Sequence, residues 1–168
     1  MEKTNHARLV IYHANPKGTG TAMRLELHPA HGETDGSVRI VLAPQRSASG
    51  ARTTPIPPPT FDWENTLRVK LDFTDLSKVL QVLRGECESV DEGRGIVHQT
   101  ATALTRISFR HLVDPIPGYS LETERIARGG GESVRAAIFF GSAEACGLAE
   151  AFAAAIPLVA FGVPEADA

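Results

Sequence analysis

The stretch from residue 61 to residue 85, FDWENTLRVKLDFTDLSKVLQVLRG, predicts one strand that passes directly into one helix. Between Leu67 and Phe73 apolar residues alternate with polar and mostly basic ones, which is the pattern of a strand with one buried face. From Thr74, a good N-cap residue, leucine and valine recur at helical spacing as far as Gly85, which suits the position after a helix. We expect the helix to cover the apolar face of the strand, so that the basic face stays free to bind a ligand.

A second copy of this strand-to-helix unit is expected near the C-terminus. Residues 133–140 (SVRAAIFF) alternate in the same way, and an apolar helix is predicted from Ser142, as its N-cap, through Ile156. Further strand-like runs precede each unit, at residues 8–13, 21–28 and 37–43 in the first half and at 86–92, 97–113 and 119–127 in the second. This order of elements indicates an internal repeat.

The predicted fold class is α+β, with two ββββα repeats that form two antiparallel four-stranded sheets and with the helices packed on one side. Strands do not alternate with helices along the chain, which argues against a Rossmann fold. At 42% hydrophobic residues, one domain is expected over residues 1–168, with the first repeat at about 8–85 and the second at about 86–162. The proline-rich segment 44–60 cannot be a central strand, so it is expected to be a disordered loop or a polyproline-like arm.

Charge and cysteine content limit the classes of function. The formal net charge of -3 gives no general attraction to polyanions, so any binding of nucleic acid must depend on local basic strips. Cys87 and Cys146 lack metal-ligand spacing, and we expect both to be buried free thiols in a reducing compartment. No signal peptide is expected, and the apolar stretch around 151–161 is expected to be too short to cross a bilayer. These features predict a cytoplasmic protein, associated with the nucleoid if it is bacterial, with no membrane partner.

Enzyme motifs are weak in this sequence. The pair His28 and His31 lies around a proline-bearing turn, which argues against a zinc site. Gly18 and Gly20 begin like a dinucleotide-binding fingerprint, but Met23 stands at the third glycine position. No G-x-S-x-G pattern surrounds the one Gly-Ser pair that precedes a predicted helix. We therefore predict no catalytic residue, no metal site, no cofactor and no enzyme activity.

Basic residues on the outward faces of the predicted strands are candidates for contact with phosphates. They are Arg24, Arg39, Arg68, Lys70, Arg106 and Arg110. Aromatic side chains at sheet edges stack unpaired bases with little regard to sequence, so we add Tyr12, Phe61, Trp63 and Tyr119. Each of these residues has a simpler alternative, because an arginine on a strand is usually only solvated and Trp63 is equally suited to packing beneath a loop.

Three motifs resemble the Whirly family of single-stranded-DNA-binding proteins. Phe61-Asp62-Trp63, followed by a basic strand and by residues 72–76 (DFTDL), is similar to the Tyr-Asp-Trp motif and helix start of that family. Residues 152–157 (FAAAIP), with Phe161-Gly162 after them, resemble its closing helix. The segment 17–23 (KGTGTAM) is similar to its Lys-Gly-Lys-Ala-Ala-Leu strand, which adds Lys17 to the candidate site. The order and spacing of these elements agree over nearly the whole chain.

The resemblance implies two four-strand-plus-helix repeats and a homotetramer held together by the helices. It further implies that single-stranded DNA lies on the outward sheets between neighbouring subunits, with broad sequence preference, in DNA maintenance or transcription regulation. Kinetoplastid guide-RNA-binding proteins and Pur-type proteins share the repeat plan, so RNA binding or annealing is an alternative. A structural protein whose sheets bind another polypeptide is the second alternative.

Overall fold

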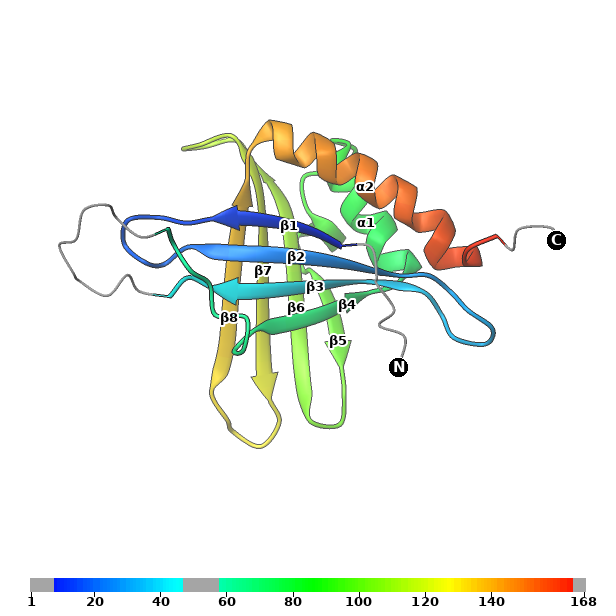
Figure 1. Ribbon diagram of the computed structural model, residues 1–168, viewed down its shortest axis with the longest axis horizontal. Coiled ribbons are helices and arrows are strands. Elements are labelled where there is room, and N and C mark those ends of the chain that lie inside the picture. Colours follow the sequence, from blue (N-terminus) through cyan, green and yellow to red (C-terminus); the bar gives the residue numbers. More distant parts are fainter. Residues whose placement is uncertain (1–7, 47–57, 165–168) are drawn as a thin grey trace.

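The computed structural model describes residues 8–46 and 58–164, which form two four-stranded antiparallel sheets and two α-helices (Figure 1). The N-terminal sheet contains β1 (Arg8–His13), β2 (Thr21–His28), β3 (Ser37–Pro44) and β4 (Leu67–Leu71), in that spatial order. α1 (Phe73–Leu83) and the short 3-10 helix η1 (Val90–Gly93) follow it. The C-terminal sheet contains β5 (Ile96–Gln99), β6 (Ala103–Leu112), β7 (Gly118–Ala127) and β8 (Ser133–Phe140), and α2 (Ser142–Phe161) comes last. The predicted α+β fold with two ββββα repeats is confirmed.

Several element boundaries differ from the sequence prediction. The run 97–113 does not form one strand, because β5 and β6 are separated by a turn that Thr100 closes through its backbone and its hydroxyl. The strand predicted at 86–92 is instead a loop that leads into η1. Both helices begin earlier than predicted, since Asp72 occupies the N-cap position of α1 and Gly141 that of α2.

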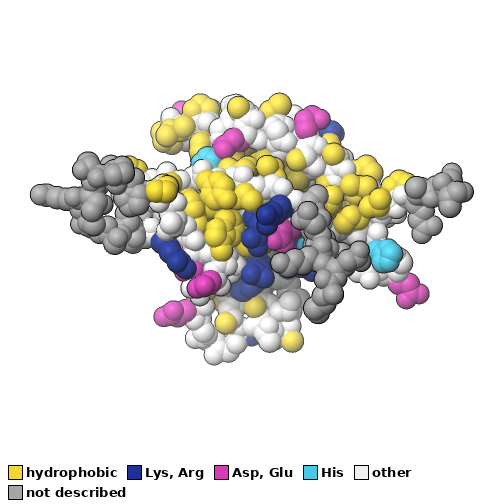
Figure 2. Space-filling view, viewed as in Figure 1, with side chains coloured by type: hydrophobic (Ala, Val, Ile, Leu, Met, Phe, Trp, Pro, Cys, Tyr) yellow, Lys and Arg dark blue, Asp and Glu magenta, His cyan; other side chains and the backbone are white. Residues whose placement is uncertain are grey.

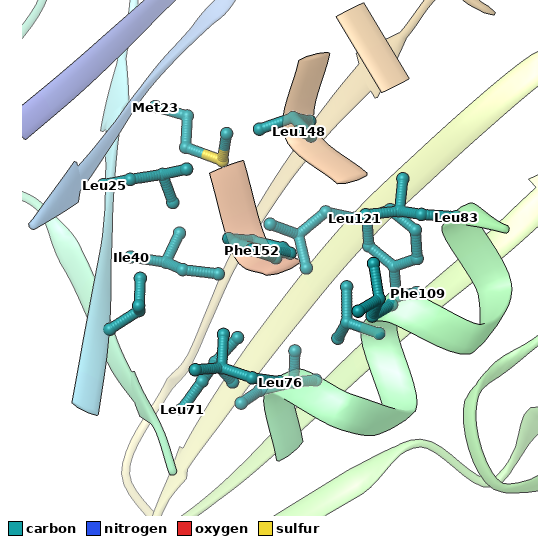
Figure 3. Packing of buried hydrophobic residues seen from close by; sticks show 14 of the residues in the cluster. Met23, Leu25, Ile40, Leu71, Leu76, Leu83, Phe109, Leu121, Leu148 and Phe152 are labelled. Atoms are coloured by element: carbon teal, nitrogen blue, oxygen red, sulfur yellow. The ribbon is translucent and has the colours of Figure 1, made fainter. Parts of the chain in front are cut away.

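The two sheets cross each other, and both helices lie along one side of the crossing (Figure 1). The inner face of each sheet carries the apolar side chains of the strand alternation, and the core joins both sheets to both helices. Figure 3 shows Leu25 and Ile40 of the N-terminal sheet with Phe109 of the C-terminal sheet and Phe152 of α2. Because the inner faces are sealed in this way, the alternate residues of every strand face outward.

Helix α2 uses only part of its surface for this packing. Its residues Leu148, Phe152 and Val159 are buried, while Cys146 and the terminal Phe161 are exposed. The prediction of two buried thiols was therefore wrong, because Cys146 lies on the unpacked side of the helix and Cys87 is exposed after α1. The apolar stretch around 151–161, which we expected to be too short to cross a bilayer, is part of a longer helix. α2 begins at Ser142, and its 20 residues have the length and composition of a membrane-spanning helix.

A reciprocal pair of histidine contacts ties the two repeats together. At the start of α1, the Asp75 carboxylate accepts a hydrogen bond from the backbone N–H of Asp72 and lies 2.8 Å from Nε2 of His98 in β5. At the start of α2, the Glu144 carboxylate accepts from the backbone of that helix and lies 2.8 Å from Nε2 of His13 in β1. The first strand of each repeat thus contributes a histidine to the N-terminal carboxylate of the other repeat's helix.

A second, smaller apolar cluster lies on the outer face of the N-terminal sheet. It consists of Ala22, Ala43 and Phe61, with Trp63 packed against it. Of the predicted loop at 44–60, residues 47–57 lie outside the described part of the chain. Beyond these residues, Phe61 pairs with Gln45, which directly follows β3, and is only 9% exposed. Its ring therefore serves mainly to pack against the sheet, and it presents little surface on which a base could stack.

We predict that His98→Ala lowers the free energy of unfolding by about 1.5–3 kcal/mol, because the buried Asp75 carboxylate loses a hydrogen-bond donor. His13→Ala should cost less, since the Glu144 side chain is 37% exposed and water can replace the imidazole. Urea unfolding of each variant measures the difference, with His31→Ala in the exposed β2–β3 turn as the control. Equal midpoints for His98→Ala and His31→Ala would contradict the role given to the reciprocal contacts.

We also predict that Phe61→Ala destabilises the protein by about 3 kcal/mol, the usual cost of removing a buried phenylalanine ring. Tyr12→Ala is the matched control, because Tyr12 lies 5.5 Å from Phe61 between ring centroids but is 61% exposed. Its effect on the unfolding midpoint should be much smaller. A Phe61→Ala variant with unchanged stability and abolished ligand binding would restore Phe61 as a contact residue.

Candidate nucleic-acid interface

The outer face of the N-terminal sheet carries most of its charge in two adjacent cross-strand rows. One row runs through Arg8, Glu26, Arg39 and Lys70, and the next runs through Val10, Arg24, Val41 and Arg68. Within these four strands the two rows hold five basic side chains and one acidic one. Figure 2 shows Lys and Arg side chains grouped in the middle of this face.

Because the two rows contain only one acidic residue, most of their basic side chains remain available to contact an anion. Glu26 is engaged by Arg24, whose Nε lies 2.7 Å from a carboxylate oxygen. Arg39, Arg68 and Lys70 are exposed, and among the described residues none of the three forms an ion pair. Hydrated, unpaired cations on one surface are the groups that neutralise phosphates. The structure thus brings together four of the predicted residues, and it adds Arg8, which the sequence analysis left unassigned although it begins a predicted strand.

An aromatic cluster borders the basic rows. The Tyr12 ring lies 6.5 Å from that of Trp63 in an edge-on arrangement, and the Arg24 guanidinium lies 5.0 Å from the centroid of the Trp63 ring. Trp63 is half-buried, whereas Tyr12 is largely exposed. An exposed ring and a partly exposed indole next to rows of basic side chains are the combination that stacks unpaired bases while their phosphates are held. Figure 2 shows hydrophobic side chains next to the basic group on this face.

The segment that carries Trp63 is fixed by Asp62. Its carboxylate accepts hydrogen bonds from the backbone N–H groups of Glu64 and Asn65, each at 3.2 Å, and from the side chains of Asn65 (2.9 Å) and Arg46 (3.3 Å). The hydrogen bond from the Asn65 side chain is the main cause that lowers the pKa of Asp62 from 3.8 to about 2. Because the folded pKa is the lower one, this stabilisation is fully present above pH 3.8 and is lost as the pH falls toward 2. The loop that positions Trp63 is therefore held by an ionised carboxylate at neutral pH.

Lys17 lies in the turn between β1 and β2, and its side chain is exposed. The turn is anchored to the sheet by Gln45, whose side-chain oxygen accepts hydrogen bonds from the backbone N–H of Asn15 (2.9 Å) and of Gly20 (3.1 Å). A side chain at Gly20 would meet the carbonyl oxygen of His13 at 2.2 Å, so glycine is required for this close approach. Lys17 therefore lies on a turn that is held in place by hydrogen bonds. The turn follows β1, the strand that contains Tyr12.

The outer face of the C-terminal sheet has a different charge pattern. Arg110 forms an ion pair with Glu122, and Arg135 forms one with Glu124, to which its Nε donates a hydrogen bond at 2.8 Å. Arg106 stands directly opposite Glu124 in the pairing of β6 with β7. The sequence analysis assigned the arginines of β6 to the site but missed the two glutamates. The two glutamates are two residues apart in β7, so they lie on one face of the strand. This spacing is the signal that would have placed them on the same face of the sheet as Arg106 and Arg110.

Tyr119 does not lie on the face that carries Arg106 and Arg110. The strand pairing puts it in one row with His111 and Phe140, on the inner side of the C-terminal sheet. Its ring centroid lies 4.9 Å from that of His111, and 6.2 Å from that of Phe109 in a stacked arrangement. The alternation of β7 thus turns the Tyr119 ring toward the core and away from the basic residues of this sheet.

Within residues 8–46 and 58–164, no three His, Cys, Asp or Glu side chains lie close enough together to hold a metal ion. The surface hollow over the C-terminal sheet is lined by Arg106, Ser108, Glu122, Glu124, Arg135 and Ala137, together with residues of the rows beneath. Charged groups of both signs surround it. The hollow therefore differs from the outer face of the N-terminal sheet, where one sign of charge dominates.

No family model and no curated protein match this sequence. Among solved structures, WHY1 from Arabidopsis thaliana matches with a TM-score of 0.71 at 17% identity, over 96% of this chain and 89% of that one. The plant transcriptional regulator PBF-2 matches with a TM-score of 0.66 at 18% identity, over 92% and 82% of the two chains. A guide-RNA-binding protein complex bound to a guide RNA matches with a TM-score of 0.58 at 17% identity, over 92% of each chain.

These matches extend over nearly the whole of both chains, so they compare complete arrangements of strands and helices. At identities below 20% they establish a shared fold, while function has to be argued from the site. The resemblance that the motifs indicated is confirmed at this level: the chain has the Whirly-type fold of two ββββα repeats.

Proposed function

We propose that this protein binds single-stranded nucleic acid, principally single-stranded DNA, on the outer face of its N-terminal sheet. The observation that carries the proposal is the pair of basic rows beside the rings of Tyr12 and Trp63, in which Arg39, Arg68 and Lys70 form no ion pair with the described part of the chain. The cations neutralise phosphates, and the rings stack bases. A local surface of this kind acts in spite of the formal net charge of -3, because phosphate contacts are short-range in physiological salt.

The same features account for the preference for unpaired strands. Base stacking on Tyr12 and Trp63 requires bases whose faces are free, which a duplex does not offer. Stacking is nearly independent of base identity, so the sequence preference should be broad. The proposed role is that of a binding protein rather than an enzyme. It rests on no cofactor, and it suits DNA maintenance or transcription regulation in the cytoplasm, or at the nucleoid of a bacterium.

RNA binding is the alternative that the comparisons support, since one protein of the same fold is a guide-RNA-binding protein bound to its RNA. PBF-2, which is a plant transcriptional regulator, supports the transcriptional role. The stacking and phosphate contacts proposed here serve either polymer, whereas the 2′-hydroxyl is the group that distinguishes them. Competition between single-stranded DNA and RNA of the same sequence decides between the two.

We predict that Arg39→Glu combined with Lys70→Glu weakens binding of a single-stranded oligonucleotide by at least about tenfold and makes the salt dependence shallower by about 1.4, or about 0.7 for each phosphate that is no longer neutralised. The sequence has one tryptophan, so fluorescence quenching reports on Trp63 directly, and anisotropy of a labelled oligonucleotide gives the dissociation constant. Arg128→Glu, in the exposed β7–β8 turn, is the control for a change of charge elsewhere. Unchanged affinity of the double variant would reject the site.

We further propose that the protein is a homo-oligomer, most simply a tetramer, in which α2 packs against other subunits. An apolar groove lies between α2 and the inner edge of the N-terminal sheet, lined by Leu9, Leu27 and Ala154 among others. Phe161, at the end of α2, is 88% exposed. Alanines on the exposed side of the helix permit close approach of a second helix, and an exposed apolar helix face is otherwise a liability. Nucleic acid would then run from the N-terminal sheet of one subunit to that of the next.

Light scattering tests this assembly. The wild-type protein should have a mass that is a multiple of 18.0 kDa, and Ala154→Glu should reduce the mass to that of the monomer, because it places a charge in the groove. Ala143→Glu is the matched control, on the same helix but outside the groove lining. A wild-type monomer would overturn the proposal, and cosedimentation of that monomer with lipid vesicles would assign the apolar face of α2 to a membrane instead.

A further inference from the structure

Arg110 and Arg135, on the outer face of the C-terminal sheet, are held by carboxylates of β7, while Arg106 stands opposite Glu124 and forms no ion pair among the described residues. Nε of Arg135 donates to a carboxylate oxygen of Glu124 at 2.8 Å, and a terminal nitrogen of Arg135 lies 2.6 Å from the same oxygen. Arg110 donates to the Glu122 carboxylate through a terminal nitrogen and to the Ser120 hydroxyl, at 3.4 Å, through Nε. These two ion pairs, Arg110 with Glu122 and Arg135 with Glu124, form what we call the ion-pair ladder. All four side chains project from the outer face of β6, β7 or β8. The carboxylates of the ladder therefore stand in the centre of the face, between the arginines of the two flanking strands.

The corresponding strand of the other repeat carries no acid on its outer face. β3 is the third strand of the first repeat, as β7 is of the second, and its outward residues are Ser37, Arg39, Val41 and Ala43. The Glu26 carboxylate on the neighbouring strand is occupied by Arg24, and the remaining cations face solvent. The two sheets thus share a repeat plan but differ in how many of their cations are free.

The ladder also shapes the surface that a polyanion would meet. Ser108 and Ala137 flank Glu122 in one cross-strand row, and their short side chains leave the hollow over the sheet. A phosphate that entered this hollow would approach Glu122 and Glu124 as closely as it approached the arginines. Moving a guanidinium from its carboxylate to a phosphate would form one charge-assisted hydrogen bond at the expense of another and would leave the carboxylate unpaired beside the new anion.

We infer that Glu122 and Glu124 are negative determinants of binding, which exclude nucleic acid from the C-terminal sheet and confine it to the N-terminal sheet. This inference rests on the proposed function and specifies which of the two sheets performs it. Arg106 and Arg110 then make no net contribution to affinity in the wild-type protein. Discrimination of this kind, through an introduced like charge, is a common means by which a surface rejects a ligand that its fold otherwise suits.

Glu122→Gln combined with Glu124→Gln tests the inference, because glutamine keeps the size of the side chain and an oxygen that can accept from arginine. We expect binding of a single-stranded oligonucleotide to become at least about tenfold tighter and the salt dependence to become steeper by about 2. Arg110 and Arg135 are then released from their carboxylates, and Arg106 no longer stands opposite a negative charge that repels a phosphate. Glu86→Gln combined with Glu88→Gln is the matched control, since both positions are exposed beyond α1 and the net charge changes equally.

Removing the arginines themselves gives a second test, both in the wild-type protein and in the Glu122→Gln, Glu124→Gln protein. Arg106→Gln with Arg110→Gln should leave wild-type affinity unchanged, but should remove most of the increase in affinity when introduced into the Glu122→Gln, Glu124→Gln protein. Circular dichroism and urea unfolding establish that each variant is folded. An Arg106→Gln, Arg110→Gln protein whose affinity falls as far as that of the Arg39→Glu, Lys70→Glu protein would overturn the inference.

The outcomes also separate this inference from the proposed function. If the wild-type protein binds no oligonucleotide, or binds one without regard to Arg39 and Lys70, the proposed site itself fails. If it binds through those residues, but the change in affinity on removing the two β7 carboxylates only matches the Glu86→Gln, Glu88→Gln control, the N-terminal site stands. The exclusion of the C-terminal sheet is then wrong.

Discussion

Burial of one face of each sheet is the constraint on which the rest of this structure depends. The two sheets cross with their apolar faces inward, and both helices complete the same core (Figures 1 and 3). Because side chains alternate along a strand, fixing Leu67 and Val69 inside fixes Arg68 and Lys70 outside. The binding surface is therefore a consequence of the core, and its residues cannot change face without a shift of strand register.

The reciprocal histidine contacts show how the two repeats become one body. His98 in the second repeat reaches Asp75 in the first, and His13 in the first reaches Glu144 in the second. Each carboxylate also closes the N-terminus of its helix, where backbone N–H groups lack partners within the helix. The orientation of each helix is thus linked to the sheet of the other repeat, which keeps the outer faces in a fixed relation.

Charge pairing, rather than the number of basic residues, distinguishes the two outer faces. Arg68 and Arg110 both occupy outward positions on strands that alternate cleanly. Arg68 is exposed and forms no ion pair with any described residue, whereas Arg110 is held by Glu122 from the neighbouring strand. A guanidinium already paired with a carboxylate offers little to a phosphate, because the exchange leaves a negative charge behind. Two sheets with the same plan can therefore have opposite suitability for a polyanion.

The sequence by itself determined the repeat order, the inner and outer residues of most strands and the resemblance in fold, since these depend on local periodicity, as at Leu67 to Leu71. It did not determine which side chains meet across strands. The packing of Phe61 on Ala22, the inward position of Tyr119 and the pairing of Arg110 with Glu122 depend on register between segments distant in the chain. Only the tertiary structure decided these contacts, because periodicity assigns a residue to a face and leaves its neighbours on that face unspecified.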